Sequence, residues 1–242
     1  MGEGAIRRTS WLATNEAIRT RRAVRGFLPD AVPRETVEEL LTLASRAPSG
    51  SNIQPWRVRV VSGEAKRALT EAICTALDAS GERPKLDWDY YPVKWREPYI
   101  GRRRKIGLGI YGLLGIGKGD TEAAERYRRR NFEFFGAPVG MIFTLEQDLE
   151  IGSWLDLGIF LGMLTIAARG RGLDTCLQQS FAEMHATLHA HFGIPDNERV
   201  ICGMALGYAD EDAVQNKLVT ERVPVADFAV FSGFPERDRG AS

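Results

Sequence analysis

The stretch Ala47-Pro-Ser-Gly-Ser-Asn-Ile-Gln-Pro-Trp56 is a polar loop that contains two prolines. Its hydroxyl and amide side chains can donate and accept hydrogen bonds, and Gly50 allows a ligand to approach the backbone closely. Such a loop suits a flat ring that carries several heteroatoms. The same residue types also build ordinary turns, so the loop alone leaves both interpretations open. The loop residues that would face a ligand are Pro48, Ser49, Gly50, Ser51, Asn52 and Gln54.

Around this loop, helical and strand patterns of apolar residues alternate along the chain. Pro33 opens a helical pattern that Pro48 stops. Gly158 and Gly162 lie four apart in a long apolar helical pattern, where small residues allow two helices to pack closely. The predicted helices are 11–20, 33–47, 63–80 and 154–169, and the predicted strands are 57–61 and 140–145.

The chain shows no internal repeat and no break in composition, which predicts a single α+β domain over residues 11–234. Residues 1–10 and 235–242 are expected to be tails. Residues 82–119 differ in kind, because they combine several tryptophans and tyrosines with three prolines and a basic run at 102–105. We interpret this segment as an excursion from the core.

The balance of charge argues against two classes of partner. Lysine plus arginine and aspartate plus glutamate are equal at 32 each, so no global field attracts nucleic acid or an anionic membrane. The first residues lack the apolar core of a signal peptide. The apolar stretch 154–168 is interrupted by Asp156 and is expected to be too short to span a bilayer. These features predict a cytoplasmic protein that binds neither nucleic acid nor membranes.

The three cysteines, Cys74, Cys176 and Cys202, are widely separated and form no Cys-x-x-Cys pair. Neither a disulfide framework nor a thiolate zinc site is indicated, which fits a reducing compartment. Free cysteines are commonly buried as small apolar residues. We expect that role for all three.

Several familiar motifs are matched only in part. Residues 107–112 have the Gly-x-Gly-x-x-Gly spacing of a dinucleotide site but follow a charged run instead of a strand. Residues 112–119 approach a P-loop, but Gly119 stands where a serine or threonine must reach the metal. His185 and His189 are spaced as zinc ligands on a helix can be, without an evident third ligand. No metal site is predicted, and no Gly-x-Ser-x-Gly elbow suggests a hydrolase.

A cluster of Arg21, Arg22 and Arg25 stands upstream of the polar loop. Guanidinium groups bind phosphate with two parallel hydrogen bonds and stay charged at any working pH. Another dense run, at 126–130, is interpreted as a solvated helix face. The upstream cluster is set apart by the helix, loop and strand that follow it.

This order of arginines, helix, Ser-Gly-Ser-Asn-Ile-Gln-Pro-Trp loop and strand resembles the nitroreductase family of FMN flavoproteins. Three later segments are also similar to the family: 172–178 (Gly-Leu-Asp-Thr-Cys-Leu-Gln), 200–208, and 216–224 (Asn-Lys-Leu-Val-Thr-Glu-Arg-Val-Pro). Residues 95–99 and 131–138 resemble its nitrobenzoate-reducing branch. The resemblance therefore covers most of the chain.

The resemblance implies an antiparallel-dominated sheet flanked by helices, in an intertwined homodimer with FMN at the subunit interface. The long apolar helix would then belong to the dimer core, and residues 220–234 would wrap onto the partner. It also implies that the polar loop reaches a flavin held mainly by the other subunit.

Roles for individual residues follow from the same resemblance. Arg21 and Arg222 would bind the FMN phosphate, while Arg22 and the Ala23 backbone would contact the ring or ribityl chain. Ala23, Thr220 and Leu177 depart from residues common in the family, and Arg25 or the basic run 102–104 could supply charge missing at Thr220. Groups near the flavin ring would come from Leu177, Gln178 and Gln179, and the candidate substrate lid contains Trp95, Tyr99 and Arg103.

The implied activity is a ping-pong cycle in which NADH or NADPH passes hydride to flavin N5, and a small electron-poor acceptor, such as a nitroaromatic or a quinone, is then reduced. No catalytic side chain is expected, because the cofactor carries the chemistry. Two alternatives remain open. One is a specialised enzyme of the same fold, a dehalogenase or a flavin-fragmenting enzyme, and the other is a flavin-binding protein without enzymatic activity.

Overall fold

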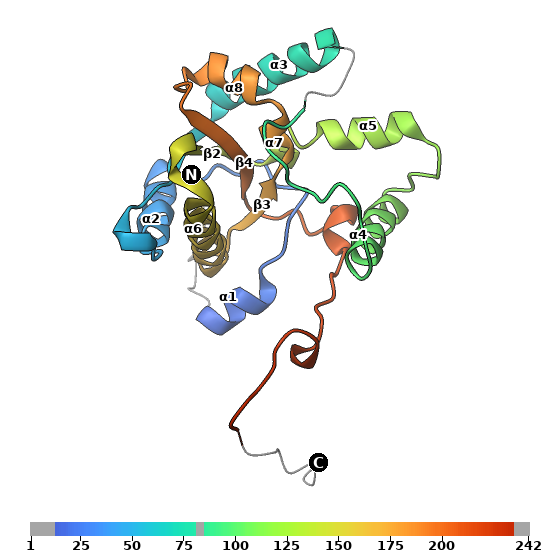
Figure 1. The fold of residues 1–242 in the computed structure, drawn as a ribbon. Coiled ribbons are helices and arrows are strands. Elements are labelled where there is room, and N and C mark those ends of the chain that lie inside the picture. Colours follow the sequence, from blue (N-terminus) through green and yellow to red (C-terminus); the bar gives the residue numbers. More distant parts are fainter. Residues whose placement is uncertain (1–12, 81–84, 235–242) are drawn as a thin grey trace, which may run out of the picture.

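A four-stranded antiparallel sheet in the order β1-β2-β4-β3 crosses the centre of the molecule (Figure 1). The structure is a computed structural model that describes residues 13–80 and 85–234, so the predicted tails at 1–10 and 235–242 lie outside the described residues. The strands are β1 (Arg57–Ser62), β2 (Val139–Glu146), β3 (Asp174–Gln178) and β4 (Glu198–Gly207). Because β1 and β3 are the outer strands, each has one edge that the sheet itself does not pair.

The helices α2 (Arg34–Ala44) and α6 (Glu150–Gly170) cover one face of the sheet. Successive side chains of a strand point to opposite faces, so Met141 and Phe143 of β2 face these helices. They pack there with Leu40 of α2 and with Phe160 and Leu164 of α6. The helical spacing of apolar residues in both helices is thus explained by burial against one face.

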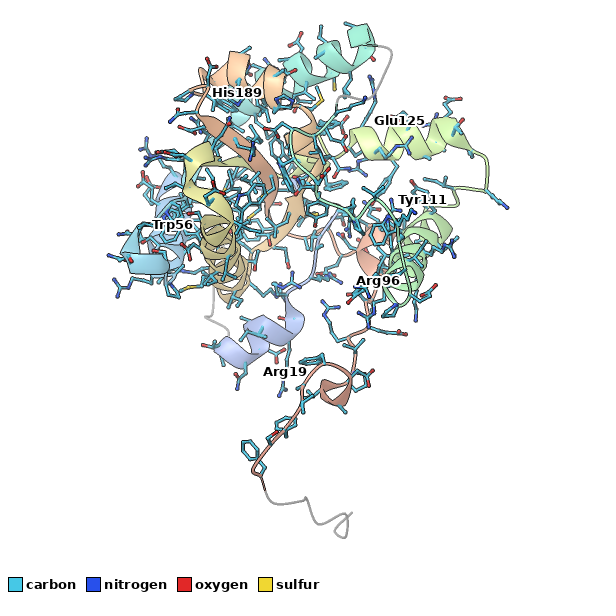
Figure 2. All side chains as sticks on the ribbon, viewed as in Figure 1. Arg19, Trp56, Arg96, Tyr111, Glu125 and His189 are labelled. Carbon is cyan, nitrogen blue, oxygen red and sulfur yellow. The ribbon has the colours of Figure 1, made fainter. Side chains whose placement is uncertain are left out.

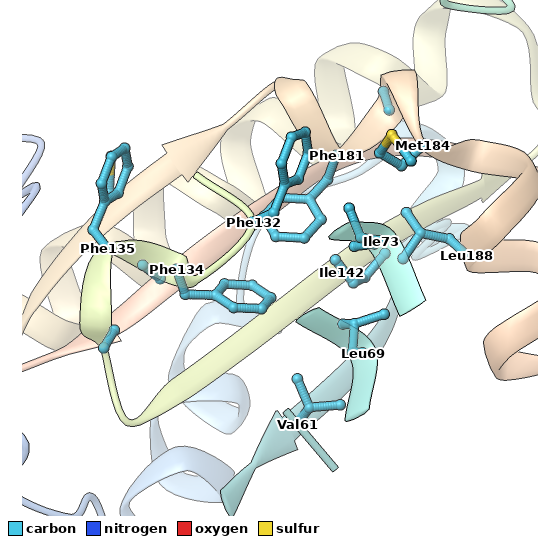
Figure 3. Packing of buried hydrophobic residues seen from close by; sticks show 14 of the residues in the cluster. Val61, Leu69, Ile73, Phe132, Phe134, Phe135, Ile142, Phe181, Met184 and Leu188 are labelled. Carbon is cyan, nitrogen blue, oxygen red and sulfur yellow. The ribbon is translucent and has the colours of Figure 1, made fainter. Parts of the chain in front are cut away.

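The opposite face is covered by α3 (Gly63–Ser80), α7 (Ser180–Glu183) and α8 (His185–Phe192). Figure 3 shows this second cluster, in which Leu69 and Ile73 of α3 meet Ile142 of β2. Phe134 and Phe181 stack with ring centroids 4.6 Å apart. Since helices bury both faces, β2 and β4 are apolar almost throughout, as a central strand should be.

Two glycines create the space for the stacked rings. A Cβ at Gly140 would lie 2.4 Å from Phe134, and one at Gly203 would lie 2.3 Å from Phe181. Real side chains do not approach so closely. The glycines therefore let the two phenylalanines lie flat on the sheet.

The excursion from the core contains α4 (Tyr99–Leu113) and is followed by α5 (Thr121–Arg129). The indole N–H of Trp88 donates to the Val200 carbonyl at 3.2 Å, and Arg199 pairs with Asp87 at 3.0 Å. These contacts fasten the irregular residues 85–98 to β4. The remaining elements are the short helix α1 (Thr14–Thr20) and the 3-10 turns η1 (Gly50–Asn52), η2 (Phe134–Gly136), η3 (Gln147–Leu149), η4 (Val214–Lys217) and η5 (Val225–Asp227).

The predicted α+β class and the antiparallel-dominated sheet are confirmed. The predicted helices and strands are present with shifted ends, and part of the first helix, at residues 11–12, lies outside the described residues. The boundaries of the single domain and of its excursion stay predictions.

The helix that contains the apolar stretch is longer than the stretch itself. Among the described residues, η3 and α6 together form a 24-residue helical segment, Gln147–Gly170, that length and composition alone would allow to cross a membrane. The polar residues at its start hid the first turns from the sequence pattern. Leu157, Phe160 and Leu164 are nevertheless buried against the sheet, which is how the core helix of a globular fold lies.

Candidate functional site

Asn216 joins the C-terminal motif to the arginine cluster. Its side-chain oxygen accepts from the Arg25 backbone N–H at 2.7 Å, and its amide nitrogen donates to the Gly26 carbonyl at 2.8 Å and to the Asp210 carbonyl at 2.9 Å. The backbone carbonyl of Asn216 accepts from the guanidinium of Arg22 at 2.8 Å. Asn216 is only 3% exposed, so these bonds form a buried junction between two predicted site segments.

The arginine segment also runs beside the outer edge of β3. Ala23 forms a parallel bridge with Thr175, and the Val24 N–H donates to the Thr175 carbonyl at 3.0 Å. Alternate residues of a strand present their backbone groups to the same edge, so the N–H of Leu177 faces outward too. Within the described residues this N–H has no backbone partner. The fold thus brings the arginine segment beside Thr175 of β3 and beside Asn216, the residues that lead into the other two predicted segments.

The arginines of this region are not equally free to bind a ligand. Arg22 pairs with Glu211 at 2.6 Å in addition to its bond with Asn216. Arg25 donates to the Ala23 carbonyl at 3.3 Å. By contrast, the side chain of Arg21 makes no hydrogen bond or ion pair with any described residue. Among the described residues, exposed Arg222 donates hydrogen bonds only within its own turn, to the Thr220 hydroxyl at 2.8 Å and to the carbonyls of residues 220 and 221.

A buried ion pair that the sequence reasoning missed lies beneath this cluster. Arg169 of α6 donates to the Asp174 carboxylate at 3.0 Å and to the Thr20 hydroxyl at 3.0 Å. Burial raises the pKa of Asp174 above its ordinary value, although the charges of Arg169 and Arg22 pull it back down. The pair ties α1, α6 and β3 together. An acidic residue at the first position of β3 was the available signal.

The two glutamines after Leu177 turn their side chains inward. Gln178 is 2% exposed and donates to the Asn131 carbonyl at 2.6 Å, while Gln179 donates to the Ile201 carbonyl at 2.9 Å. Because these side-chain amides are bonded within the chain, a flavin ring would meet mainly the backbone groups of residues 177–179, whose role stays a prediction. The side-chain oxygen of Gln178 and the hydroxyl of Ser180 are buried and have no hydrogen-bond partner among the described residues.

The polar loop is held in a defined shape on α6. The Asp156 carboxylate accepts from the Gly50 N–H at 3.2 Å, and the Ser49 hydroxyl accepts from the Gln54 N–H at 3.0 Å. Ser51, Asn52 and Gln54 have φ of 49°, 58° and 50°, a left-handed conformation that non-glycine residues seldom adopt. Such strain gathers at functional sites. Asp156, which only interrupted an apolar stretch in the sequence, is what holds the loop.

This loop lies apart from the other predicted site segments of the same chain. Trp56, at its end, stacks on Phe160 of α6 with ring centroids 4.8 Å apart. Figure 2 places Trp56 at the opposite side of the molecule from Arg96 and Tyr111 of the predicted excursion. Among the described residues, no hydrogen bond or ion pair joins residues 48–54 to 21–25 or 216–222. In one chain, the predicted site residues therefore form two separate groups, the loop 48–54 and the arginine and C-terminal segments.

In the candidate lid, guanidinium groups lie over aromatic rings. Arg103 lies over Trp95 at 4.9 Å and over Tyr91 at 5.4 Å, measured to the ring centroids. Arg96 and Arg102 lie 5.1 Å and 5.8 Å from the centroid of Tyr99. Cation–π contacts of this kind hold a cation against a ring face. Two arginines of the basic run therefore contact different rings: Arg103 lies over Trp95 and Tyr91, and Arg102 lies beside Tyr99.

The partial motifs have structural roles. Residues 107–112 lie inside α4 with no strand before them, and 112–119 form the end of that helix and a turn. A ring nitrogen of His189 forms a hydrogen bond with the Ile194 carbonyl at 3.1 Å.

Burial raises the pKa of Cys176 to about 11 and that of Cys202 to about 12, which keeps both as thiols near neutrality. In the described part of the chain, no group of three or more histidine, cysteine, aspartate or glutamate residues is placed to hold a metal ion.

Comparison with known proteins gives consistent matches. A profile of the group described as Nitroreductase family matches residues 18–208. A 4-nitrobenzoate reductase of Nocardioides sp. (strain LMS-CY) is 40% identical over 222 residues, which cover 90% of each chain.

Two solved structures superpose on nearly the whole chain. NfnB of Sphigopyxis sp. strain HMH, an FMN- and NADPH-dependent nitroreductase, is 32% identical with a TM-score of 0.88, covering 92% of this chain and 100% of that one. NfnB of Mycobacterium smegmatis, an FMN-dependent nitroreductase in complex with NADPH, is 34% identical with a TM-score of 0.85, covering 90% and 97%.

Proposed function

Because this chain belongs to the nitroreductase family, we propose that it is an FMN-dependent oxidoreductase that transfers reducing equivalents from NADH or NADPH to an electron-poor acceptor. The observation that carries the proposal is the junction at Asn216, which gathers the arginine segment and the C-terminal motif beside β3. These are the segments whose sequences resemble the flavin-binding parts of the family.

The donors present fit FMN. Arg21 and Arg222, which have no ionic partner among the described residues, would hold the phosphate. Arg22 and the Ala23 backbone would contact the ribityl chain or the ring, and the outward N–H of Leu177 would face a ring acceptor. When bound, FMN supplies the hydride chemistry. The polypeptide contributes binding, orientation and hydrogen-bond donors, so no side chain needs to act as a general acid or base.

The second wall of the site would come from a partner subunit. The loop 48–54 stands apart from the arginine segment, so a homodimer with FMN at its interface would let the loop of one subunit complete the site of the other. Ile151 and Leu155 on α6 are 84% and 69% exposed. The extended arm at 219–234 also exposes Phe228, Val230 and Phe231 (Figure 1). Exposed apolar patches of this kind mark interaction surfaces.

The acceptor is proposed to be a nitroaromatic compound, with quinones as a second chemical class. The 4-nitrobenzoate reductase of Nocardioides supports the first class by its similarity. Trp95, Tyr99 and Arg103 would form the lid, because aromatic rings with guanidinium groups over them suit a flat electron-poor ring. The cytoplasmic location stays a prediction.

Anaerobic reduction tests the activity directly. The purified protein is mixed with NADH or NADPH, the flavin absorbance is followed, and an acceptor panel of nitrobenzoates and quinones is then added. We expect bleaching by at least one nucleotide and recovery of the absorbance on adding acceptor. A yellow protein that neither nucleotide bleaches would be a flavin carrier, and a protein that binds no added FMN would contradict the proposal entirely.

A charged substitution tests the interface. Leu155→Glu places a carboxylate on the exposed apolar face of α6, and Leu108→Glu places one on α4, where Leu108 is 75% exposed. In light scattering coupled to gel filtration, we expect Leu155→Glu to be monomeric and free of FMN, while Leu108→Glu stays dimeric. A dimeric Leu155→Glu variant that retains FMN would rule out this face.

A further inference from the structure

A groove separates α4 from the C-terminal segment 220–224. It has a volume of about 580 Å³ and is lined by Arg102, Lys105, Ile106 and residues 220–224. The segment is held close to the helix because Leu218 packs on Gly109, where a Cβ would lie 2.8 Å from the leucine methyl. The groove therefore begins immediately beyond the Asn216 junction.

Positive charge dominates the groove. It contains the cations of Arg102, Lys105 and Arg222 against the single carboxylate of Glu221, although the whole chain has a formal net charge of zero. Arg102 pairs with no carboxylate among the described residues. A local excess of this kind points to an anionic ligand.

Lys105 and Glu221 form an ion pair at 2.6 Å across the groove, with side chains 67% and 76% exposed. An exposed pair of this type contributes little to stability, because water and salt screen it. A more highly charged anion can therefore displace the carboxylate and take over the lysine. Glu221 is then an internal competitor for the same cation.

Among small anions, a phosphate monoester matches these groups best. It carries close to two negative charges near neutrality and has three strong acceptor oxygens. Arginine binds such a group with two parallel hydrogen bonds, and lysine binds it as a point charge. The Thr220 hydroxyl accepts from Arg222 at 2.8 Å, so its own hydrogen is available for a phosphate oxygen.

We propose that Arg102 and Lys105 of α4 complete a phosphate-monoester site with Arg222, and that Glu221 weakens it by competing for Lys105. The inference rests on the proposed function, which supplies two sources of this chemistry, the 5′-phosphate of FMN and the 2′-phosphate of NADPH. The helix thus provides the positive charge that Thr220 does not.

The test compares ligands that differ only in the phosphate. Flavin fluorescence titrations of the full-length apoprotein with FMN and with riboflavin give two dissociation constants. Titrations of the holoprotein with the oxidised nucleotides NADP⁺ and NAD⁺, which cannot reduce the flavin, give two more, read as quenching of the flavin fluorescence. The variants are Arg102→Gln, Lys105→Gln and Glu221→Gln. Arg104→Gln, on the same helix but outside the groove, is the control.

If the phosphate is that of FMN, Arg102→Gln and Lys105→Gln weaken FMN by about tenfold, the effect of one charged hydrogen bond, and leave riboflavin unchanged. Glu221→Gln tightens FMN, and added salt reduces all of these differences. If the phosphate is that of NADPH, the same pattern appears in the ratio of the NADP⁺ to NAD⁺ affinities, since NADP⁺ carries the same 2′-phosphate.

Variants that change neither ratio, or that weaken FMN and riboflavin equally, would overturn the site. A wild-type protein that binds no flavin would instead refute the proposed function, so the two failures are distinguishable.

Discussion

The side-chain oxygen of Asn216 accepts a hydrogen bond of 2.7 Å from the backbone N–H of Arg25, 191 residues earlier in the chain. This bond brings the N-terminal arginines and the C-terminal arm to the same edge of β3. Neighbouring Gln215 adds a bond of 2.8 Å to the Arg25 carbonyl. Both backbone groups of Arg25 are thereby satisfied by the segment that leads to Arg222.

Asn216→Ala should weaken both the fold and the cofactor site. The substitution leaves the Arg25 N–H without its partner, and such a buried unsatisfied group costs about 1–3 kcal/mol. The Gly26 carbonyl loses one of its two bonds and still accepts from the Asp210 N–H at 3.0 Å. Urea unfolding should show the loss in stability, and FMN fluorescence titration should show weaker binding. Asn197→Ala, at an exposed position, serves as control and should change neither. Equal FMN affinity in both variants would contradict the role of the junction.

Asp156→Ala should release the polar loop. The carboxylate holds the Gly50 N–H at 3.2 Å, and a hydrogen bond to a charged group contributes about 1.5–3 kcal/mol. Without it, the left-handed residues that follow can relax. We expect lower FMN affinity with nearly unchanged far-ultraviolet circular dichroism. Asp148→Ala, on the exposed turn η3, should retain wild-type affinity. A loop that stays resistant to limited proteolysis in Asp156→Ala would argue against this anchor.

Gly203→Ala should destabilise the sheet. Its Cβ would lie 2.3 Å from Phe181, and overpacking a core typically costs about 1–3 kcal/mol. Thermal and urea unfolding measure the loss. The matched control is Gly107→Ala in α4, where a Cβ meets nothing within 4 Å. Alanine is a better helix former than glycine by up to about 1 kcal/mol, so that variant should be equally or more stable.

Glu198 should contribute to the acid sensitivity of the fold. Burial alone would raise its pKa, but hydrogen bonds from Thr144 at 2.5 Å and from Arg59 at 3.0 Å, with the arginine charge, bring it below the ordinary value. A carboxyl with a lowered folded pKa stabilises the protein above its unfolded pKa of about 4.3, and that contribution disappears as pH falls through the folded pKa.

Glu198→Gln should therefore be less stable than wild type at pH 7, with the difference shrinking toward pH 3. Urea unfolding across this range measures it. Glu64→Gln, which removes a carboxylate whose side chain is 79% exposed, should run parallel to wild type. A constant difference between Glu198→Gln and wild type at all pH values would show that the carboxylate does not titrate as described.

The elements were predictable because their causes are local. Apolar spacing in α2 and α3 and the buried run in β2 follow from which faces those residues bury. The start of α6 could not be predicted from the sequence, since its first turn carries Glu150 and precedes the apolar pattern. The direction of Gln178 was equally hidden, because a glutamine on a strand can face either a ligand or Asn131.

From local chemistry alone, the sequence determined that this protein has helices and strands in this order, a polar loop after one helix, and arginines at both ends of the domain. Only the tertiary structure decided which arginines remain available. Glu211 forms an ion pair with Arg22, whereas Arg21 and Arg222 have no ionic partner among the described residues. It also decided that the loop stands on Asp156, away from those arginines. Such pairings depend on strand order and on contacts between residues far apart in the chain, and the local periodicity of apolar residues carries no information about them.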